Sequence, residues 1–303
     1  MRRNYGTYGK STTAKKAKRF SLKSLVPYLY VLPAAVLVTV FFVMSAIYTL
    51  GLSFTDWDGL SALHFIGFDN YLRLFQDEYF IQSFLNTLIW VFFALIIPVI
   101  IPLLLAIMIT NSRWGSIFKN LFYLPNAVSP TIGALIMTSL LSNYGLPKLL
   151  ELWGLTENTT YWLGIPHVNT FVMIGAGIWQ GIGTNLILLI VGLSNLPGEP
   201  IEAAKLDGAS TSQLYRYVVL PLLKPTLIVV LLMAIINSFK TFDGIWLMTG
   251  GGPYRSSETL AVTMYKESFI NGSYGYGSAV ATVLSVIVLL ISIIYLRQTF
   301  KEK

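Results

Sequence analysis

The sequence predicts an all-α integral membrane protein with six transmembrane helices. Only 12% of its 303 residues are charged, against about 25% in an average soluble domain, and the mean hydropathy is +0.65. A helix needs about 20 apolar residues to cross a bilayer, and runs of that length occur six times. They fall at about 26–50, 84–109, 117–141, 168–193, 222–247 and 278–297.

The two ends of the chain are expected to be short polar tails. Residues 1–25 hold many Lys and Arg residues and no acid, which is typical of a disordered segment lying on an anionic membrane surface. The apolar run that follows is too long for the core of a signal peptide and lacks a small-residue cleavage site, so we expect a retained first span. Residues 26–297 would form one membrane domain, followed by a C-terminal tail at 298–303.

Proline residues lie inside several of the predicted spans. They are Pro33 in the first, Pro98 and Pro102 in the second, and Pro125 and Pro130 in the third. Packed membrane helices tolerate proline because neighbouring groups bond the carbonyls that it frees. We therefore expect kinks within these three spans.

The distribution of Lys and Arg predicts which side each loop faces. Sixteen of the 21 lie in the two tails, around residues 113–119, or in and beside the loop at 194–221. Four lie in the loops at 51–83, 142–167 and 248–277, and Lys240 stands near the end of the fifth span. Because cytoplasmic loops are enriched in Lys and Arg, both termini and the 194–221 loop should face the cytoplasm.

The 194–221 loop is polar yet patterned for two short helices. Pro200 suits a first helical turn, residues 202–206 are good helix formers, and Gly208 stands where a left-handed residue would end the helix. Ser210 and Gln213 have the spacing of a capping box for a second helix. That helix would carry one apolar face, formed by Leu214, Tyr217 and Val218. We call this predicted helix-turn-helix the knob.

A helix-turn-helix can also read DNA, but the charge of the knob argues against nucleic acid as a partner. The acidic residues Glu199, Glu202 and Asp207 balance the basic residues Lys205, Arg216 and Lys224. A phosphate backbone requires a clear excess of positive charge. The knob is therefore interpreted either as an ordinary connecting loop or as a handle for a protein partner.

The residues of the knob resemble the EAA loop of ABC-importer permease subunits. Its three segments are Glu202-Ala203-Ala204, Asp207-Gly208-Ala209 and Val218-x-Leu220-Pro221. The sugar-importer branch is the more similar one, because its loops also end in L-P-x-x-x-P, as Leu220 to Pro225 do here. Other passages resemble the same branch, and together they cover most of the chain: Gly67-Phe-Asp-Asn-Tyr71, Asn86-Thr87, Trp179-Gln180-Gly181, Thr249-Gly-Gly-Gly-Pro253 and Glu258-Thr259-Leu260.

This resemblance implies a multi-subunit importer in a bacterial cytoplasmic (inner) membrane. The expected partners are a second similar permease, two ATPase subunits and an extracytoplasmic solute-binding protein that delivers a sugar or oligosaccharide. The first helix of such loops docks in a cleft of the ATPase subunit. Carried over onto this sequence, the ATPase-coupling residues are Glu202, Ala203, Ala204, Asp207, Gly208 and Ala209.

The chain shows no catalytic or metal-binding motif of its own. Gly9-Lys10-Ser11 resembles the end of a phosphate-binding loop, but the first glycine of that motif would fall at Asn4. There is no cysteine, and His64 and His167 stand alone. We therefore expect no enzyme activity, no metal site and no cofactor in this chain, with ATP and Mg²⁺ held by a partner ATPase.

Polar residues inside the apolar spans are candidates for the substrate path. They are Trp179, Gln180 and Asn185 in span four, and Asn237, Lys240 and Asp243 toward the outer end of span five. Two other roles remain open for them. Polar residues also bond neighbouring helices to each other, and Lys240 could extend to the membrane interface and pair with Asp243.

Two rival functions make different demands on the sequence. A permease for glycerol-phosphate or another polyol fits the same loop pattern, although an anionic substrate would favour several buried cations and Lys240 is the one available in the spans. An ion-coupled secondary transporter would require carboxylates within the spans and an inverted repeat, and the sequence shows neither. The preferred hypothesis is a permease for a neutral sugar.

Overall fold

The computed structural model describes residues 26–301, and the chain divides into two compact units, Met1–Tyr48 and Thr49–Lys303. The predicted basic tail at 1–25 and the last two residues lie outside the described part. The first unit contains α1 (Val26–Val38), the π-helix η2 (Thr39–Met44) and the start of α2 (Ser45–Leu52). Together they make a continuous helical stretch, Tyr28–Leu52, that is long and apolar enough to span a membrane.

The second unit is built from helices of very different lengths, joined by loops. In chain order they are α3 (Asp69–Leu74), α4 (Glu78–Thr110), α5 (Gly115–Tyr123), η3 (Leu124–Ala127), α6 (Pro130–Leu140), α7 (Leu146–Leu152), η4 (Trp162–Gly164), α8 (Val168–Ser194), α9 (Gly198–Leu206), α10 (Thr211–Leu214), η5 (Tyr215–Val219), α11 (Leu220–Phe239), α12 (Asp243–Thr249), α13 (Leu260–Tyr265), η6 (Lys266–Ile270) and α14 (Tyr274–Lys301). Within residues 26–301 there is no β-strand, and an isolated bridge joins Thr55 to Phe65. The all-α prediction is confirmed.

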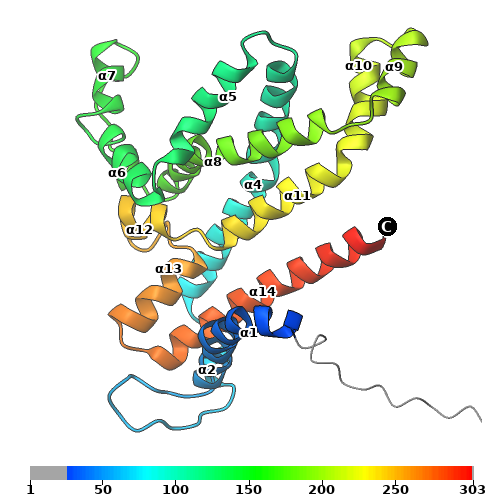
Figure 1. The fold of residues 1–303 in the computed structure, drawn as a ribbon. Coiled ribbons are helices and arrows are strands. Elements are labelled where there is room, and N and C mark those ends of the chain that lie inside the picture. Colours follow the sequence, from blue (N-terminus) through cyan, green and yellow to red (C-terminus); the bar gives the residue numbers. More distant parts are fainter. Residues whose placement is uncertain (1–25, 302–303) are drawn as a thin grey trace, which may run out of the picture. The chain divides into compact units, whose positions relative to one another are not determined.

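Three apolar clusters hold the second unit together. The first joins α4, α8 and α11 through residues such as Ala106, Leu186 and Leu223, all of which are completely buried. The second packs α6 and α8 against α12, and the third packs α3, α4 and α13 against α14. Figure 1 shows α4, α8 and α11 crossing in the middle of this unit, with α9 and α10 beyond the far ends of α8 and α11.

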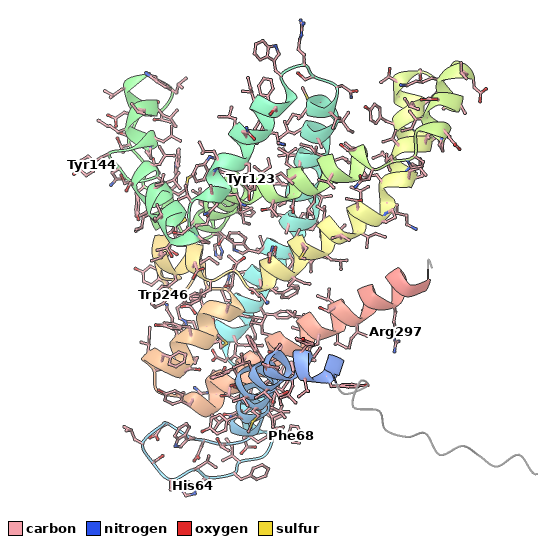
Figure 2. All side chains as sticks on the ribbon, viewed as in Figure 1. His64, Phe68, Tyr123, Tyr144, Trp246 and Arg297 are labelled. Atoms are coloured by element: carbon pink, nitrogen blue, oxygen red, sulfur yellow. The ribbon has the colours of Figure 1, made fainter. Side chains whose placement is uncertain are left out.

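Glycine allows α5 and α8 to cross closely. A Cβ atom added to Gly183 on α8 would lie 2.8 Å from the carbonyl oxygen of Phe122 and 2.9 Å from the Cα atom of Tyr123, which ends α5. Figure 2 labels Tyr123 at this crossing. Any larger residue at position 183 would force the two helices apart.

Five described helical stretches are long and apolar enough to cross a membrane, and a sixth is added if a bent pair counts as one span. The bent pair replaces the third predicted span, at 117–141: the helices Gly115–Ala127 and Pro130–Leu140 meet at 95°. The expectation of a kink is therefore corrected to a break. Pro130 has no N–H to continue the preceding helix, and Ser129 starts a new one by accepting a hydrogen bond from the backbone of Ile132.

The fifth predicted span, at 222–247, is also interrupted. Helix α11 ends at Phe239, and α12 begins at Asp243 after a short turn. The side-chain hydroxyl of Thr259 donates a hydrogen bond to the carbonyl of Thr241 in this turn, at 2.9 Å. A carbonyl that leaves the helix ladder is thus satisfied from a loop further along the chain, which stabilises the interruption.

Candidate functional site

The predicted corner of the knob is present and has the geometry of a Schellman motif. The backbone N–H of Gly208 donates to the carbonyl of Lys205 at 3.1 Å, and that of Ala209 donates to the carbonyl of Ala204 at 3.0 Å. Gly208 has φ +78°, and an added Cβ would meet nothing within 4 Å. Glycine is therefore needed here for its left-handed backbone conformation and not for space.

The second helix of the knob begins with the predicted capping box. The Ser210 hydroxyl accepts from the backbone of Gln213, and the Gln213 side chain accepts from the backbone of Ser210 at 2.8 Å. The helix then continues through the π-helical turn η5 into α11, giving one stretch from Thr211 to Phe239. The second helix of the knob is therefore continuous with a helix that is long and apolar enough to span the membrane (Figure 1).

The buried face of this second helix differs from the prediction. Leu214 and Val219 are buried, whereas Tyr217 is 67% exposed and Val218 is half-buried. The predicted face assumed the spacing of an α-helix, in which residues three and four apart lie together. The π-turn adds a residue per turn, so residues five apart share a face instead.

The six predicted coupling residues lie on the surface of the knob. Glu202, Ala203, Asp207 and Gly208 are exposed, and Ala204 and Ala209 are half-exposed. Within the described part of the chain the carboxylates of Glu202 and Asp207 make no hydrogen bond or ion pair. Leu206, which the motif does not include, stands between its first two segments and is 88% exposed. Leu206 therefore lies on the same exposed surface as the coupling residues, next to Asp207.

A hydrogen bond between residues far apart in the sequence joins the knob to the end of α4. The side-chain amide of Asn111, which caps α4, donates to the hydroxyl of Tyr215 at 2.8 Å and also to the carbonyl of Ile107 at 2.7 Å. Because α4 packs against both α8 and α11, the knob is fixed to the same three-helix cluster from two directions.

Asn185, a predicted substrate-path residue, bonds two helices together. It is buried, and its side-chain amide donates to the carbonyl of Pro98 on α4 at 2.8 Å. Pro102 has no N–H to donate to the carbonyl four residues earlier, which is that of Pro98. Asn185 therefore supplies the hydrogen bond that Pro102 cannot.

Gln180 has a similar bonding role, and Trp179 does not. The side-chain amide of Gln180 donates at 3.1 Å to the carbonyl of Val128, at the break between η3 and α6. A Cβ added to Gly133 on α6 would lie within 2.7 Å of that amide, so α6 packs tightly over it. Trp179 is 37% exposed on α8. The structure thus brings Gln180 and Asn185 into helix contacts and leaves Trp179 at the surface of the chain.

The three candidates of span five gather at the break between α11 and α12. Asn237, Lys240 and Asp243 are all exposed in this chain. Among the described residues no ion pair joins Lys240 to Asp243, so the predicted pairing is not formed. Trp246 stacks on Phe242 with ring centroids 5.8 Å apart and fixes the start of α12 beside them (Figure 2). The break therefore presents polar groups that no other described part of the chain covers.

Near the start of α4, at the end away from the knob, several residues of the passages that resemble the sugar-importer branch meet. The side-chain amide of Asn86 donates to the carbonyls of Ser256 and Glu258, at 2.8 and 2.9 Å. The hydroxyl of Thr87 accepts from the backbone of Leu260 at 3.0 Å. The resemblance to the permease family assigned no role to these passages. The structure shows that they tie the 248–277 loop to the start of α4.

Glu258 is the centre of this loop. Its side chain is only 1% exposed, and its carboxylate accepts from Arg255 at 2.8 Å, from Thr263 at 3.0 Å and from Lys266. Burial alone would lower the pKa of Arg255, but the neighbouring Glu258 and Glu267 carboxylates raise it above its usual value. Gly251 must be glycine, because it has φ +84° and an added Cβ would lie 2.4 Å from the Glu258 side chain.

The loop at 51–83 is closed by hydrogen bonds between its own residues. Asn70 is buried and donates to the carbonyls of Ser53 and Thr55, at 2.9 and 2.7 Å. Further along, the Asp58 carboxylate accepts from the backbones of Leu60 and Ser61. The Ser61 and Leu60 backbone bonds lower the pKa of Asp58 to about 2. These are contacts that close turns within the loop.

Among the described residues no group of three His, Asp or Glu side chains could hold a metal ion.

An all-helical bundle of apolar spans that carries an exposed two-helix knob defines the membrane component of a larger transport assembly. Residues 80–301 match the family model for the binding-protein-dependent transport system inner membrane component. The chain belongs to this family.

Relatives support the same conclusion. The chain is 31% identical to the multiple sugar-binding transport system permease of Streptococcus mutans, over 82% of this chain and 86% of that protein. It is 32% identical to the sn-glycerol-3-phosphate transport system permease of Yersinia pestis, over 90% and 94%. Among solved structures, a bacterial ABC transporter involved in the import of the acidic polysaccharide alginate matches with a TM-score of 0.80 and 23% identity, over 92% of this chain and 96% of that chain.

The predicted membership of the ABC-importer permeases and the predicted permease fold are both confirmed. The chain is a permease component of a binding-protein-dependent transporter in an inner membrane. The membership sets aside the enzyme and the ion-coupled secondary transporter.

Proposed function

We propose that this permease translocates a neutral sugar or oligosaccharide, which an extracytoplasmic binding protein delivers to it. In this proposal it pairs with a second, similar permease, and two ATPase subunits drive the cycle by docking on the knob. ATP and Mg²⁺ would be bound by those subunits. Both termini and the knob would face the cytoplasm of a bacterium.

The observation that carries the ATPase role is the state of the knob. Its Glu202 and Asp207 carboxylates are exposed and unbonded within the described chain, and Leu206 beside them is 88% exposed. The corner and the cap are nevertheless fully formed. Carboxylates that are unused within a rigid, exposed element are available to accept hydrogen bonds from a protein partner.

The break at 240–242 supports a path at the contact with a second permease. Lys240, Asp243 and Asn237 are exposed in this chain, and a charged side chain inside a membrane is costly unless it reaches the interface, pairs with another group or faces a water-filled cavity. A partner permease and an aqueous path between the two would remove that cost. Trp179, also exposed, could line the path, whereas Gln180 and Asn185 would position its helices.

Glycerol-phosphate or another polyol is the alternative substrate, and one relative carries that substrate in its name. A phosphate would favour several cations at the break, and Lys240 is the one that the described structure provides there. This favours a neutral sugar. Uptake of labelled sugars and of glycerol-phosphate by cells that express the full gene cluster would separate the two.

The ATPase contact is tested by affinity co-purification of the tagged permease with its ATPase, comparing the native chain with Gly208→Pro. Proline cannot adopt a positive φ, so the corner of the knob should break and the ATPase should be lost. Gly154→Pro is the matched control, because Gly154 (φ +70°) ends α7 with the same pair of backbone bonds and also has nothing within 4 Å of an added Cβ. That control should retain the ATPase. Absence of an ATPase with the native chain would overturn the proposal.

A further inference from the structure

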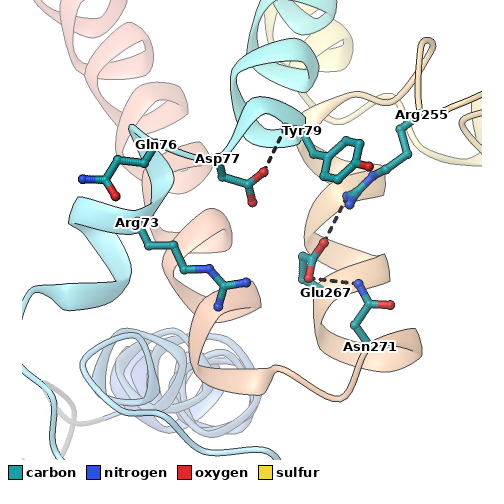
Figure 3. Close-up of a pocket in the computed structure, with 7 residues that line it drawn as sticks. All are labelled: Arg73, Gln76, Asp77, Tyr79, Arg255, Glu267 and Asn271. Carbon is teal, nitrogen blue, oxygen red and sulfur yellow. Dashed lines mark hydrogen bonds and ion pairs between the residues drawn. The ribbon is translucent and has the colours of Figure 1, made fainter.

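A polar pocket of about 440 Å³ lies at the start of α4, at the end of this helix that is farthest from the knob. Its walls come from α3, the start of α4, the 248–259 loop and η6. Figure 3 shows the residues that line it: Arg73, Gln76, Asp77, Tyr79, Arg255, Glu267 and Asn271.

The two acids of the pocket are already bonded within the chain. Asp77 accepts from the backbone of Tyr79 at 2.9 Å and from the hydroxyl of Tyr276 at 2.5 Å. Glu267 accepts from Arg255 at 3.0 Å with one oxygen and from Asn271 at 3.0 Å with the other. Each of these four carboxylate oxygens therefore already has a partner within the chain.

Arg73 is the opposite case. Its guanidinium lies over the ring of Tyr276, 4.2 Å from the ring centroid, and makes no hydrogen bond or ion pair within the described part of the chain. Stacking on a ring holds a guanidinium in one plane and leaves its N–H groups free to grip a carboxylate. The unused binding capacity of the pocket is therefore that of a positioned, unpaired cation.

A large aromatic side chain is exposed next in sequence to Arg255, which lines the pocket. Tyr254 adjoins Arg255 and is 93% exposed. Both residues have a left-handed backbone, with φ of 51° and 61°, which is costly for side chains of this size and is concentrated at functional sites. A small solute inside the pocket would leave Tyr254 uncovered, whereas a protein surface would cover the tyrosine and the pocket together.

From this geometry we infer that the pocket receives an acidic side chain of the extracytoplasmic binding protein, held by Arg73, with Tyr254 packed against the same partner. The inference rests on the proposed function, because it requires a binding protein that docks on this face. Asp77 caps α4 and Tyr79 lies in its first turn. Docking would therefore act on the first turn of α4. The C-cap of the same helix, Asn111, is hydrogen-bonded to the knob.

The test uses the complete transporter, permease pair and ATPase together, reconstituted in lipid nanodiscs. The purified binding protein encoded with it is titrated, and the rate of ATP hydrolysis is measured. In Arg73→Gln the binding-protein concentration for half-maximal stimulation should rise about fivefold to tenfold, the range expected for loss of a charged contact, while the maximal rate stays close to native. Added salt should raise that concentration in the native transporter more than in the variant.

Two further variants keep the inference falsifiable. Arg73→Lys retains the charge without the fork and should fall between the native chain and Arg73→Gln. Lys148→Gln removes a different cation, one already paired with Glu151 at 2.8 Å, and should leave the half-maximal concentration unchanged. An unchanged value in Arg73→Gln would overturn this inference alone. Failure of the binding protein to stimulate the native transporter would overturn the proposed function with it.

Discussion

The sequence motifs found near the two ends of α4 are equally easy to recognise, but their polar groups are used in opposite ways. At one end Asn86, Thr87 and Glu258 are buried, and every one of them is hydrogen-bonded within the chain. At the other end Glu202 and Asp207 are exposed and unbonded within the described residues. Polar groups that are satisfied internally stabilise a fold, whereas free ones are available to a partner. Resemblance to a family identifies both kinds of motif and does not tell them apart.

The largest effect is expected from a labelling experiment that asks whether the two ends lie on opposite sides of the membrane. The chain contains no cysteine, so Leu206→Cys on the knob and Tyr254→Cys beside the pocket can each be introduced singly. In right-side-out vesicles a membrane-impermeant maleimide should label Tyr254→Cys fully and Leu206→Cys only after permeabilisation, because the native residues are 93% and 88% exposed and the charge pattern places them on different sides. Equal labelling of both in sealed vesicles would contradict the predicted topology.

The next effect concerns thermal stability, and it separates the buried, internally bonded acid Glu258 from the exposed acid Glu202. Glu258→Ala leaves Arg255 and Lys266 without their shared, almost fully buried carboxylate. Removing one partner of a buried ionic cluster costs about 3–5 kcal/mol, so thermal unfolding in detergent should occur at a clearly lower temperature. Glu202→Ala on the knob should change unfolding by no more than about 0.5 kcal/mol, as is usual for an exposed site.

Glu202→Ala serves as the control for that experiment, because it removes the same acid group from an exposed site on the knob. It should nevertheless lose binding of the ATPase in co-purification, whereas any Glu258 variant that folds should retain it. If the two variants were equally stable, the division into internally bonded and free motifs would be wrong.

A smaller effect should decide what the polar residues of the spans do. Asn185→Ala leaves the carbonyl of Pro98 unbonded in the helix interior, which should cost about 1–3 kcal/mol of stability and leave the substrate concentration for half-maximal uptake unchanged. Lys240→Ala, at an exposed position, should show the reverse pattern. Uptake kinetics and thermal unfolding of both variants provide the measurement, and a raised half-maximal concentration in Asn185→Ala would return that residue to the substrate path.

The sequence predicted the helical class, the number of apolar runs and the corner and cap of the knob, because each of these depends on residues close together in the chain. It could not assign Asn185, since its partner Pro98 is 87 residues away and the packing of α4 on α8 is a tertiary fact. In principle the proline pattern contained a signal, because Pro102 must free one particular carbonyl. The contact of Asn86 with Glu258 joins residues 172 positions apart, and no local pattern indicates it.

The breaks in spans three and five show a second limit. Hydropathy measures whether a run can lie in a membrane and carries no information on whether it stays straight. In span three, Pro130 indicated that the helix is interrupted. It did not indicate a break, which is stabilised by the Ser129 cap and by the hydrogen bond from the Gln180 amide to Val128. At Lys240 the signal was absent, because the bond that satisfies the turn comes from Thr259.

The smallest effect tests the hydrogen bond that joins the end of α4 to the knob. Tyr215→Phe removes only the hydroxyl that accepts from Asn111. A partly exposed hydrogen bond contributes about 0.5–1 kcal/mol, so unfolding should hardly change. The knob would then be held to the bundle mainly through Leu214 and Val219 on its own helix, and the amount of substrate transported per ATP hydrolysed should fall on the order of twofold. Tyr217→Phe is the control, since Tyr217 is 67% exposed and its ring, which faces Arg216, is retained. A native transport ratio in Tyr215→Phe would mean that movement of the knob reaches the membrane helices through α11 alone.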